Sequence, residues 1–396
     1  MSVAEAEGGK RSSFLAFDKL GVLIALIIVA GALMPFTIFR ANRIVLGEGR
    51  SLIEALDPVM TLVLCAVLIA GFVVALWRVD TRAKLVVGFM VLAVLAINVG
   101  LSADYLTPEE NNFSRISPGA GFWLLTFAFA LMVADALTRL RFKAWTRLGI
   151  LAAVAAAVAV LLWSGTLDNL SILREYATRA DAFWQEARMH LLLAFGAVAI
   201  AILVGVPLGI FCYRTPSVRA AILNVLNIVQ TIPSIALFGL LIAPLAWVAL
   251  HVPGARAIGI SGIGTAPALV ALFFYSLLPI VANTVVGLQS VPEAANDAAK
   301  GMGMTDRQRL WAVELPLAFP VILTGIRIVL VQDIGLATIA ALIGGGGFGV
   351  FVFQGIGQTA MDLVLLGAVP TVALAFAAAV VLDAIVEMVS TPERPK

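Results

Sequence analysis

The chain has 396 residues, of which 61% are hydrophobic and 13% are charged, and its formal net charge is +2. A soluble globular domain has roughly 45–50% apolar and about 25% charged residues. The composition therefore excludes an ordinary water-soluble protein, and we expect membrane lipid to be the main surroundings of this chain. We expect no nucleic-acid partner.

Long apolar runs recur along the chain, and as helices they are long enough to cross about 30 Å of hydrocarbon. They lack the alternation of apolar and polar residues that a barrel strand needs. We therefore predict an all-α fold, a polytopic transmembrane helix bundle of about 10 helices. In chain order the predicted helices are 20–39, 59–77, 85–101, 120–137, 148–164, 190–213, 225–250, 266–288, 318–343 and 362–388.

The first apolar run follows Lys10, Arg11 and Lys19, a charge pattern that also precedes the apolar core of a secretory signal peptide. This run is longer than such a core. The sequence Pro35-Phe36-Thr37 near its end is not a small-residue cleavage site. We interpret the run as a first anchor helix.

Lysine and arginine are distributed unevenly between the segments that connect the helices. With a cytoplasmic N-terminus, the inside segments hold 17 of these residues and the outside segments hold 8. Because cytoplasmic loops of membrane proteins are enriched in Lys and Arg, we predict that both termini are cytoplasmic. The predicted inside segments are 1–19, 78–84, 138–147, 214–221, 289–317 and 389–396.

The chain divides in two at about residue 165. The run 149–160 is rich in alanine and carries no motif, whereas the later helices contain Pro, Gly, Asn and Gln at membrane depth. Polar and helix-breaking residues are costly there and so indicate function. We predict an N-terminal five-helix membrane extension over 1–165 and a functional five-helix core over 166–396.

The sequence contains no pattern typical of a metal or catalytic site. His190 and His251 have no carboxylate or thiol neighbours at metal-ligand spacing. Cys65 and Cys212 lie inside apolar runs, so we expect them to pack rather than to form a disulfide.

Several residues of the core suit helix contacts or a transport path. Gly205 and Gly209 form a small-residue face that lets two helices approach closely. Uncharged polar groups at membrane depth suit a path that must release its solute, although half of them could simply bond neighbouring helices. These candidate path residues, together with Asp333, are Gln230, Thr231, Ser234, Asn283, Thr284 and Gln332.

The long inside segment 289–317 carries a regular spacing. An acidic residue and two alanines are followed after three residues by a glycine, and after nine more by aliphatic-x-Leu-Pro. Asn296 or Asp297 can cap a short helix with a small alanine face, and Gly303 then lets the chain turn. The residues that fill or flank the spacing are Asp297, Ala298, Ala299, Gly301, Gly303, Val313, Leu315 and Pro316.

This spacing resembles the EAA loop of ABC importer permeases, with Asp297 in place of the usual Glu and Val313 in place of the usual Ile. The upstream Glu293-Ala294-Ala295 has the same letters at the wrong distance from the glycine. The segments 230–237, 275–284, 301–304 and 339–349 are similar to permeases of osmoprotectant importers, which carry glycine betaine, choline, carnitine or proline betaine. The resemblance covers about residues 186–390, and the preceding helices resemble only an extended subgroup.

The resemblance implies a complex in the bacterial inner membrane. It comprises a second permease subunit, the same or homologous, cytoplasmic ABC ATPase subunits docked on the EAA loops, and a periplasmic solute-binding protein. This chain would bind no cofactor, because the partner ATPase would hold ATP and Mg²⁺, and it would not itself be an enzyme. Two alternatives remain open: an ABC permease for an amino acid, methionine or a sulfonate, and an ion-coupled secondary transporter.

Two charged residues fall inside the predicted helix 318–343. Arg327 and Asp333 are six residues apart and hence about 120° apart around the axis, so an intrahelical pair is not expected. We expect Arg327 to snorkel or to pair with another helix. Asp333 is a candidate for facing the path, and the alternative is a structural partner.

A glycine run follows this helix on the predicted outer side. Its spacing also satisfies G-x-G-x-x-G, but an apolar helix precedes it, which is the wrong setting for a dinucleotide site. A mobile re-entrant or substrate-guiding loop and a plain glycine turn both remain open. The outer glycine loop comprises Gly344, Gly345, Gly346, Gly347 and Gly349.

Overall fold

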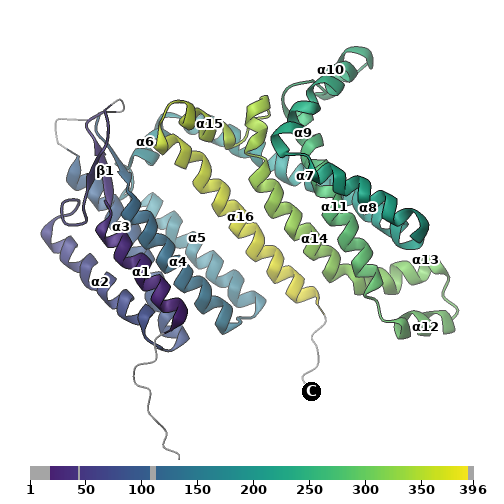
Figure 1. Ribbon diagram of the computed structural model, residues 1–396, viewed down its shortest axis with the longest axis horizontal. Helices are drawn as coiled ribbons and strands as arrows, with labels where there is room; N and C mark the ends of the chain where they lie inside the picture. Colours follow the sequence, from purple (N-terminus) through teal and green to yellow (C-terminus); the bar gives the residue numbers. More distant parts are fainter. Residues whose placement is uncertain (1–17, 43–44, 108–112, 391–396) are drawn as a thin grey trace, which may run out of the picture. The chain divides into compact units, whose positions relative to one another are not determined.

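The computed structural model describes residues 18–42, 45–107 and 113–390, which are mostly helical (Figure 1). The chain divides into two compact units. Unit 1 comprises Met1–Phe142 and Ala157–Arg174, and unit 2 comprises Lys143–Ala156 and Glu175–Lys396. Helices α5 and α6 each contribute residues to both units. The predicted cytoplasmic termini lie outside the described residues.

In the described residues, unit 1 contains the four complete helices α1 to α4. The start of α2 illustrates how local residues begin a helix. Asp57 accepts hydrogen bonds from the N–H groups of Val59 and Met60, and Pro58 occupies the first turn. A small antiparallel sheet in the order β2-β1-β3 joins the helices. The elements are α1 (Lys19–Leu33), β1 (Thr37–Arg40), β2 (Glu48–Arg50), α2 (Pro58–Leu76), α3 (Thr81–Leu106), β3 (Arg115–Pro118) and α4 (Ala120–Leu140), followed by the shared helices α5 (Ala144–Trp163) and α6 (Ser171–Thr178).

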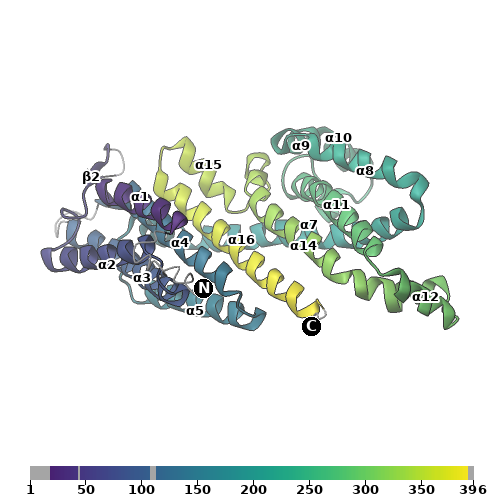
Figure 2. The ribbon, with the colours of Figure 1, turned by 60° about the horizontal axis from the view of Figure 1, so that its bottom comes forward.

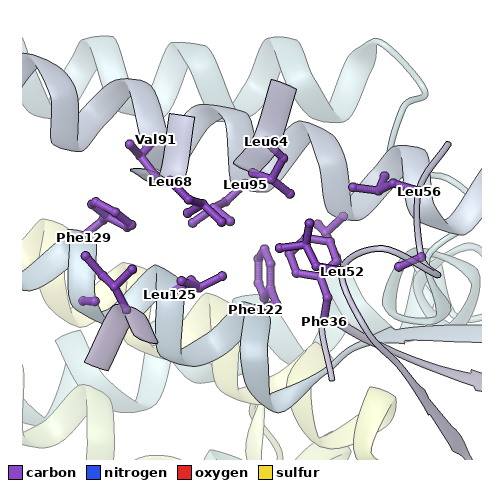
Figure 3. Close-up of a cluster of buried hydrophobic side chains, with 14 of the residues drawn as sticks. Phe36, Leu52, Leu56, Leu64, Leu68, Val91, Leu95, Phe122, Leu125 and Phe129 are labelled. Atoms are coloured by element: carbon purple, nitrogen blue, oxygen red, sulfur yellow. The ribbon is translucent and has the colours of Figure 1, made fainter. Parts of the chain in front are cut away.

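The core of unit 1 is apolar and lies between these helices. Figure 3 shows Phe129 near Leu125 on α4, with Leu64 and Leu95 on the neighbouring helices α2 and α3. Phe36, from the segment before β1, packs edge-on against Phe122 at a ring distance of 6.0 Å. The sequence analysis missed the sheet, because strands of three or four residues are too short to show a period.

Unit 2 is built around three packed helices, α7, α11 and α14. A Cβ on Gly205 would meet Ile280 at 2.9 Å, and one on Gly209 would meet Thr284 at 2.5 Å, so the predicted close approach of two helices is confirmed for α7 and α11. The elements of unit 2 are α7 (Ala180–Arg214), α8 (Pro216–Thr231), α9 (Ser234–Leu240), α10 (Ile242–His251), η1 (Arg256–Ile258), α11 (Thr265–Gln289), α12 (Glu293–Gly301), α13 (Asp306–Arg309), η2 (Leu310–Glu314), α14 (Leu315–Leu336), η3 (Ile339–Ile343), α15 (Gly349–Gly357) and α16 (Met361–Val389).

The predicted helix bundle is confirmed. Within the described ranges, nine helical stretches are long and apolar enough to cross a membrane, and one of them is α9 and α10 taken together. Helix α1 is a shorter apolar helix of 15 residues. Cys65 and Cys212 are free thiols, as expected.

Three predicted helix ranges extended past a helix-breaking residue, and a fourth, 190–213, began too late, because α7 starts at Ala180. The range 20–39 ends as a helix at Leu33, because the backbone before Pro35 is extended. The range 225–250 is broken at Ile232, before Pro233. The range 318–343 ends as an α-helix at Leu336 and continues as the 3₁₀-helix η3, after Gly335 has weakened it.

Candidate functional site

Helix α12 has a well-defined C-terminal end. Met304 N–H donates to the Ala299 carbonyl (3.1 Å) and Gly303 N–H donates to the Lys300 carbonyl (2.9 Å), which together form a Schellman motif. Gly303 adopts the left-handed conformation that this motif requires, with φ of 79°. The predicted turn at Gly303 is therefore confirmed. The sequence signature of the loop is explained at this position by backbone geometry.

The start of α12 differs from our expectation. The helix begins at Glu293 after Pro292, so Asn296 and Asp297 lie inside it and do not cap it. Proline is favoured at a helix start because its fixed φ suits the entry and its missing N–H is not needed there. The expectation was wrong because it considered only side chains that can cap a helix and overlooked Pro292.

Most residues of α12 that fit the EAA spacing are exposed. Asp297 and Ala298 face outward, whereas Ala299 is 1% exposed and packs inward. A Cβ added to Gly301 or Gly303 would meet nothing within 4 Å. Figure 2 shows α12 projecting beyond the ends of α11 and α14 in unit 2. The helix thus presents a small-residue surface with no intramolecular contact at these glycines.

A buried ion cluster lies behind this helix. The carboxylate of Glu314, with a side chain 1% exposed, contacts Arg309 at 2.9 Å and Arg214 at 2.8 Å. Arg309 also contacts the exposed Asp306 at 2.9 Å. Arg214 ends α7 and Glu314 immediately precedes α14, so the cluster ties the loop to both helices.

The segment Leu310–Glu314 forms a π-helix, which runs directly into Leu315 and Pro316 at the start of α14. Such π-turns are rare and occur mostly within helices at functional positions. The widened turn carries Glu314 to the two arginines. Leu315 packs partly buried beside Leu288 and Ile322, whereas Pro316 is exposed.

The outer glycine loop lies at the other end of α14 and is closely packed. Gly344, Gly346 and Gly347 have positive φ angles of 75°, 76° and 88°. A Cβ on Gly345 would meet the Ala340 carbonyl at 2.9 Å, and one on Gly349 would meet the Thr338 carbonyl oxygen at 1.8 Å. These glycines are required by turns and by close backbone contact.

The glycine loop is held by α7. The N–H of Gly347 donates to the Glu186 carboxylate at 2.6 Å. His190, one turn further along α7, is fully buried, and its ring lies 5.0 Å from that of Phe348. Both ring nitrogens of His190 lack a hydrogen-bond partner among the described residues. From the sequence we considered His190 only for a metal or catalytic role, and its packing against Phe348 was not predicted.

Asp333 is fully buried in the last turn of α14. Its Oδ2 accepts a hydrogen bond of 2.6 Å from the Ser276 hydroxyl on α11, and its Oδ1 has no hydrogen-bond partner in the described part of the chain. Gln332 beside it is half-buried. The structure thus gives Asp333 a neutral hydrogen-bond donor on a neighbouring helix.

Arg327 pairs with another helix, as one of our two expectations required. Its Nη1 contacts Asp383 on α16 at 2.7 Å. Asp383 and Glu387 also contact Arg147 in the first half of α5, which belongs to unit 2. Glu387 further accepts a hydrogen bond of 3.1 Å from the N–H of Ala144.

Three candidate path residues lie beside the break between α8 and α9, and one of them, Gln230, contacts a neighbouring helix. Gln230 Nε2 donates to the Tyr275 carbonyl on α11 at 2.8 Å, and the Tyr275 hydroxyl donates to the Ile232 carbonyl. Thr231 is exposed and donates to Ile228 within its own helix at 2.6 Å. Ser234 is half-buried at the start of α9.

The two candidate path residues on α11 lie at helix contacts. Asn283 donates to Pro279 within α11 at 2.8 Å, and a Cβ on Gly325 of α14 would meet its side chain at 2.7 Å. Thr284 is fully buried against Gly209 of α7. The structure therefore distributes the candidate path residues over several separate contacts.

The fold is that of a polytopic membrane protein, and unit 2 carries the exposed short helix α12 at one end. Residues 201–391 match the family model described as "Binding-protein-dependent transport system inner membrane component", and residues 18–173 match "ABC transporter permease YehY, N-terminal domain". The chain therefore belongs to the family of ABC importer permeases. Such a permease is not itself catalytic and implies ATPase and binding-protein partners.

Two named relatives and one solved structure are similar to about half of this chain. "Osmoprotectant import permease protein OsmW" of Salmonella typhimurium is 42% identical over 207 residues, which cover 52% of this chain and 89% of the relative. "Glycine betaine/carnitine/choline transport system permease protein OpuCB" of Bacillus subtilis is 39% identical over 207 residues, covering 52% and 86%. A chain of the MetNI methionine ABC transporter in an inward-facing form has 22% identity and a TM-score of 0.47, covering 53% of this chain and 96% of that chain.

Proposed function

We propose that this permease subunit imports a small osmoprotectant, such as glycine betaine, choline or a related quaternary amine. The observation that carries the proposal is the 42% and 39% identity to osmoprotectant permeases over 89% and 86% of their lengths. A quaternary amine cannot donate hydrogen bonds from its nitrogen, so a path for it needs weak acceptors and apolar walls rather than a tight polar cage. Thr231, Asn283 and Thr284 each donate to a carbonyl of their own helix, so these donors are already used, which suits this demand.

The assembly follows from the family. Two permease subunits, identical or homologous, form the membrane part; two cytoplasmic ATPase subunits hold ATP and Mg²⁺; and a periplasmic protein delivers the solute. In this arrangement both termini and α12 face the cytoplasm. The contact of Arg214 with Glu314 supports part of this topology, because it brings the predicted inside segments 214–221 and 289–317 to the same end of unit 2.

In this proposal α12 docks the ATPase. Its exposed Asp297 and Ala298 and the open space at Gly301 and Gly303 provide a surface on which a partner groove can close. Leu315 and Pro316 start the helix that receives the motion. Because the Glu314 cluster joins the loop to α7 and α14, a displacement of α12 reaches two helices of the membrane core.

A charge reversal with a matched control tests the docking surface. Asp297 is 72% exposed and its contact with Lys300 at 3.2 Å contributes little to stability, so Asp297→Lys should leave the fold intact. We expect this variant to lose co-purification of the ATPase and ATP-dependent uptake. Glu293→Lys makes the same charge change at the first residue of the same helix, outside the EAA spacing, and should retain both. Wild-type co-purification with Asp297→Lys would overturn the docking assignment.

Asp333 and the outer glycine loop are proposed to act on the solute. Asp333 retains one carboxylate oxygen without a partner among the described residues, and a carboxylate can favour a passing cation by charge. The remaining candidates Gln230, Thr231, Ser234, Asn283, Thr284 and Gln332 would line the path when the helices move. The glycine loop, tied to α7 through Glu186, would close its outer end.

Uptake into vesicles tests the substrate. The complete complex, with its ATPase and binding protein, is reconstituted and supplied with labelled glycine betaine, choline, carnitine, methionine or taurine. We expect ATP-dependent uptake of a quaternary amine and no uptake driven by an ion gradient alone. Uptake of methionine or taurine with no quaternary amine uptake would overturn the substrate class. Uptake without ATP would overturn the importer mechanism.

We also propose that residues 1–165 form a membrane extension that the import step itself does not need. A truncation that removes residues 1–165 would also remove Arg147 and so leave Asp383 and Glu387 without this ion-pair partner. A chain that starts at residue 143 keeps these ion pairs. We expect it to transport as the full chain does, and a folded, ATPase-bound truncation with no uptake would contradict the proposal.

A further inference from the structure

Unit 1 contains a cationic pocket that none of the functions above uses. It has a volume of about 410 Å³. Four of its lining residues are cations, contributed by three helices and by the turn between α2 and α3, and one is an acid. The residues used below are Asp18, Lys19, Arg78, Thr81, Lys84 and Arg139.

The positive charge of the pocket exceeds what its carboxylate neutralises. Lys84 is 6% exposed and contacts Asp18 at 2.8 Å. Arg139 contacts Asp135 at 2.8 Å and lies 3.7 Å from Asp18. Lys19 and Arg78 are exposed and have no ion-pair partner in the described part of the chain. Two cations are therefore left to attract an anion.

Backbone donors add to this charge. Helix α3, with 26 residues, begins at Thr81, and its preceding residue Asp80 makes no side-chain cap hydrogen bond. The first N–H groups of an α-helix have no intrahelical partner, and the helix dipole places partial positive charge there. Phosphate groups bind to such ends. The Thr81 hydroxyl supplies a further donor at the same place.

The pocket lies where the head groups of a bilayer are expected. Helix α2 has 19 residues and so a length of about 28 Å, close to the roughly 30 Å of hydrocarbon, and Trp77 and Arg78 follow its end. Trp77 is 37% exposed and Val79 is 40% exposed. Tryptophan is enriched at the boundary between hydrocarbon and head groups, and basic pockets between helices on the inside bind anionic head groups.

We propose that this pocket binds the phosphate of an anionic phospholipid head group. Arg78 and Lys19 contact the phosphate, and the start of α3 donates hydrogen bonds to it. Lys84 is already neutralised by Asp18 and holds the pocket together. The exposed Trp77 and Val79 pack against the upper part of the acyl chains. The shared chemistry is that of a phosphate, which free inorganic phosphate also offers.

Lipid titration of the full chain, in its complex and in a neutral detergent, tests the proposal by native mass spectrometry. Phosphatidylglycerol and phosphatidylcholine with the same acyl chains are the probes. We expect a phosphatidylglycerol adduct whose dissociation constant rises about fivefold in Arg78→Gln, the factor for about 1 kcal/mol per basic residue near a membrane surface. Arg82→Gln removes an exposed charge from the same segment without lining the pocket, and should change it less than twofold.

Other results would overturn the proposal. Equal effects of Arg78→Gln and Arg82→Gln would show diffuse attraction rather than a site. Equal affinity for phosphatidylcholine, whose phosphate is balanced by a choline cation, would exclude selectivity for an anionic head group. Inorganic phosphate that binds as tightly as the lipid would replace the lipid as the ligand. If Arg78→Gln does not fold, Lys19→Gln, at another exposed cation of the pocket, makes the same test.

Discussion

The glycine-containing loops at the two ends of α14 differ in how closely other atoms pack around their glycines. In the segment 289–317, which we call the coupling loop after its proposed role, an added Cβ at Gly301 or Gly303 meets nothing within 4 Å. In the outer loop, an added Cβ at Gly349 would lie 1.8 Å from a backbone oxygen. The outer glycines are explained by contacts within the chain. The exposed Ala298 and Gly301 of α12 are not, and Gly303 is explained only by its backbone turn, which is why we assign this surface to a partner.

The largest effect is expected from Gly349→Ala. Its methyl group would overlap the Thr338 carbonyl oxygen, which belongs to the backbone and cannot rotate away. Overpacking of this kind costs about 3 kcal/mol, and we expect a strong loss of monodisperse protein in size-exclusion chromatography. Gly357→Ala, at the other end of α15 in open space, is the control. Equal yields of the two variants would show that the outer loop is not closely packed.

Glu314→Gln should have a similarly large effect, since it leaves two arginines without their common partner. Breaking a buried ion pair by removing one partner costs about 3 kcal/mol, which thermal denaturation would detect. Asp306→Asn is a matched control, because Asp306 contacts the same Arg309 with a side chain that is 82% exposed. Its expected cost is about 0.5 kcal/mol. Similar costs for the two would mean that the cluster does not anchor the coupling loop.

Asp333→Asn tests the proposed role of Asp333, which lies in the interior of unit 2, in solute passage. The asparagine oxygen can still accept the hydrogen bond from Ser276, so we expect normal folded yield and normal ATPase co-purification. The uptake rate of a cationic or zwitterionic solute should fall about fivefold, because a transport path binds its solute weakly at any one point. Reduced yield would indicate a structural role, and unchanged yield with unchanged uptake would refute a role in passage.

The smallest effects on stability are expected from two alanine substitutions at α12, and they should have opposite signs. Gly303→Ala places a side chain at φ of 79° and should destabilise by about 1 kcal/mol. Gly301→Ala lies in the helix with open space around it and should stabilise by about 0.5 kcal/mol. If the surface docks the ATPase, Gly301→Ala should nevertheless weaken co-purification. Unchanged binding with this added methyl group would place the contact elsewhere on the loop.

The sequence by itself determined the helical membrane fold, because apolar composition and run length need no knowledge of neighbours. It also located the loop 289–317 and the turn at Gly303, because a residue spacing and a left-handed glycine are local features. The predicted helix ends were least accurate near proline and glycine. Pro35, Pro233 and Gly335 shortened or split helices that hydropathy alone had extended.

Tertiary structure alone decided which polar groups meet. Arg214 and Glu314 are 100 residues apart, and Ser276 and Asp333 are 57 apart, so neither pair follows from a local period. A helical pattern gives the side of a helix that is apolar but not the helix that covers it. For that reason Asp333 could be proposed as a path residue from the sequence. Its burial against Ser276 and the ion pairs of Glu314 with Arg214 and Arg309 are visible only in the packed helices.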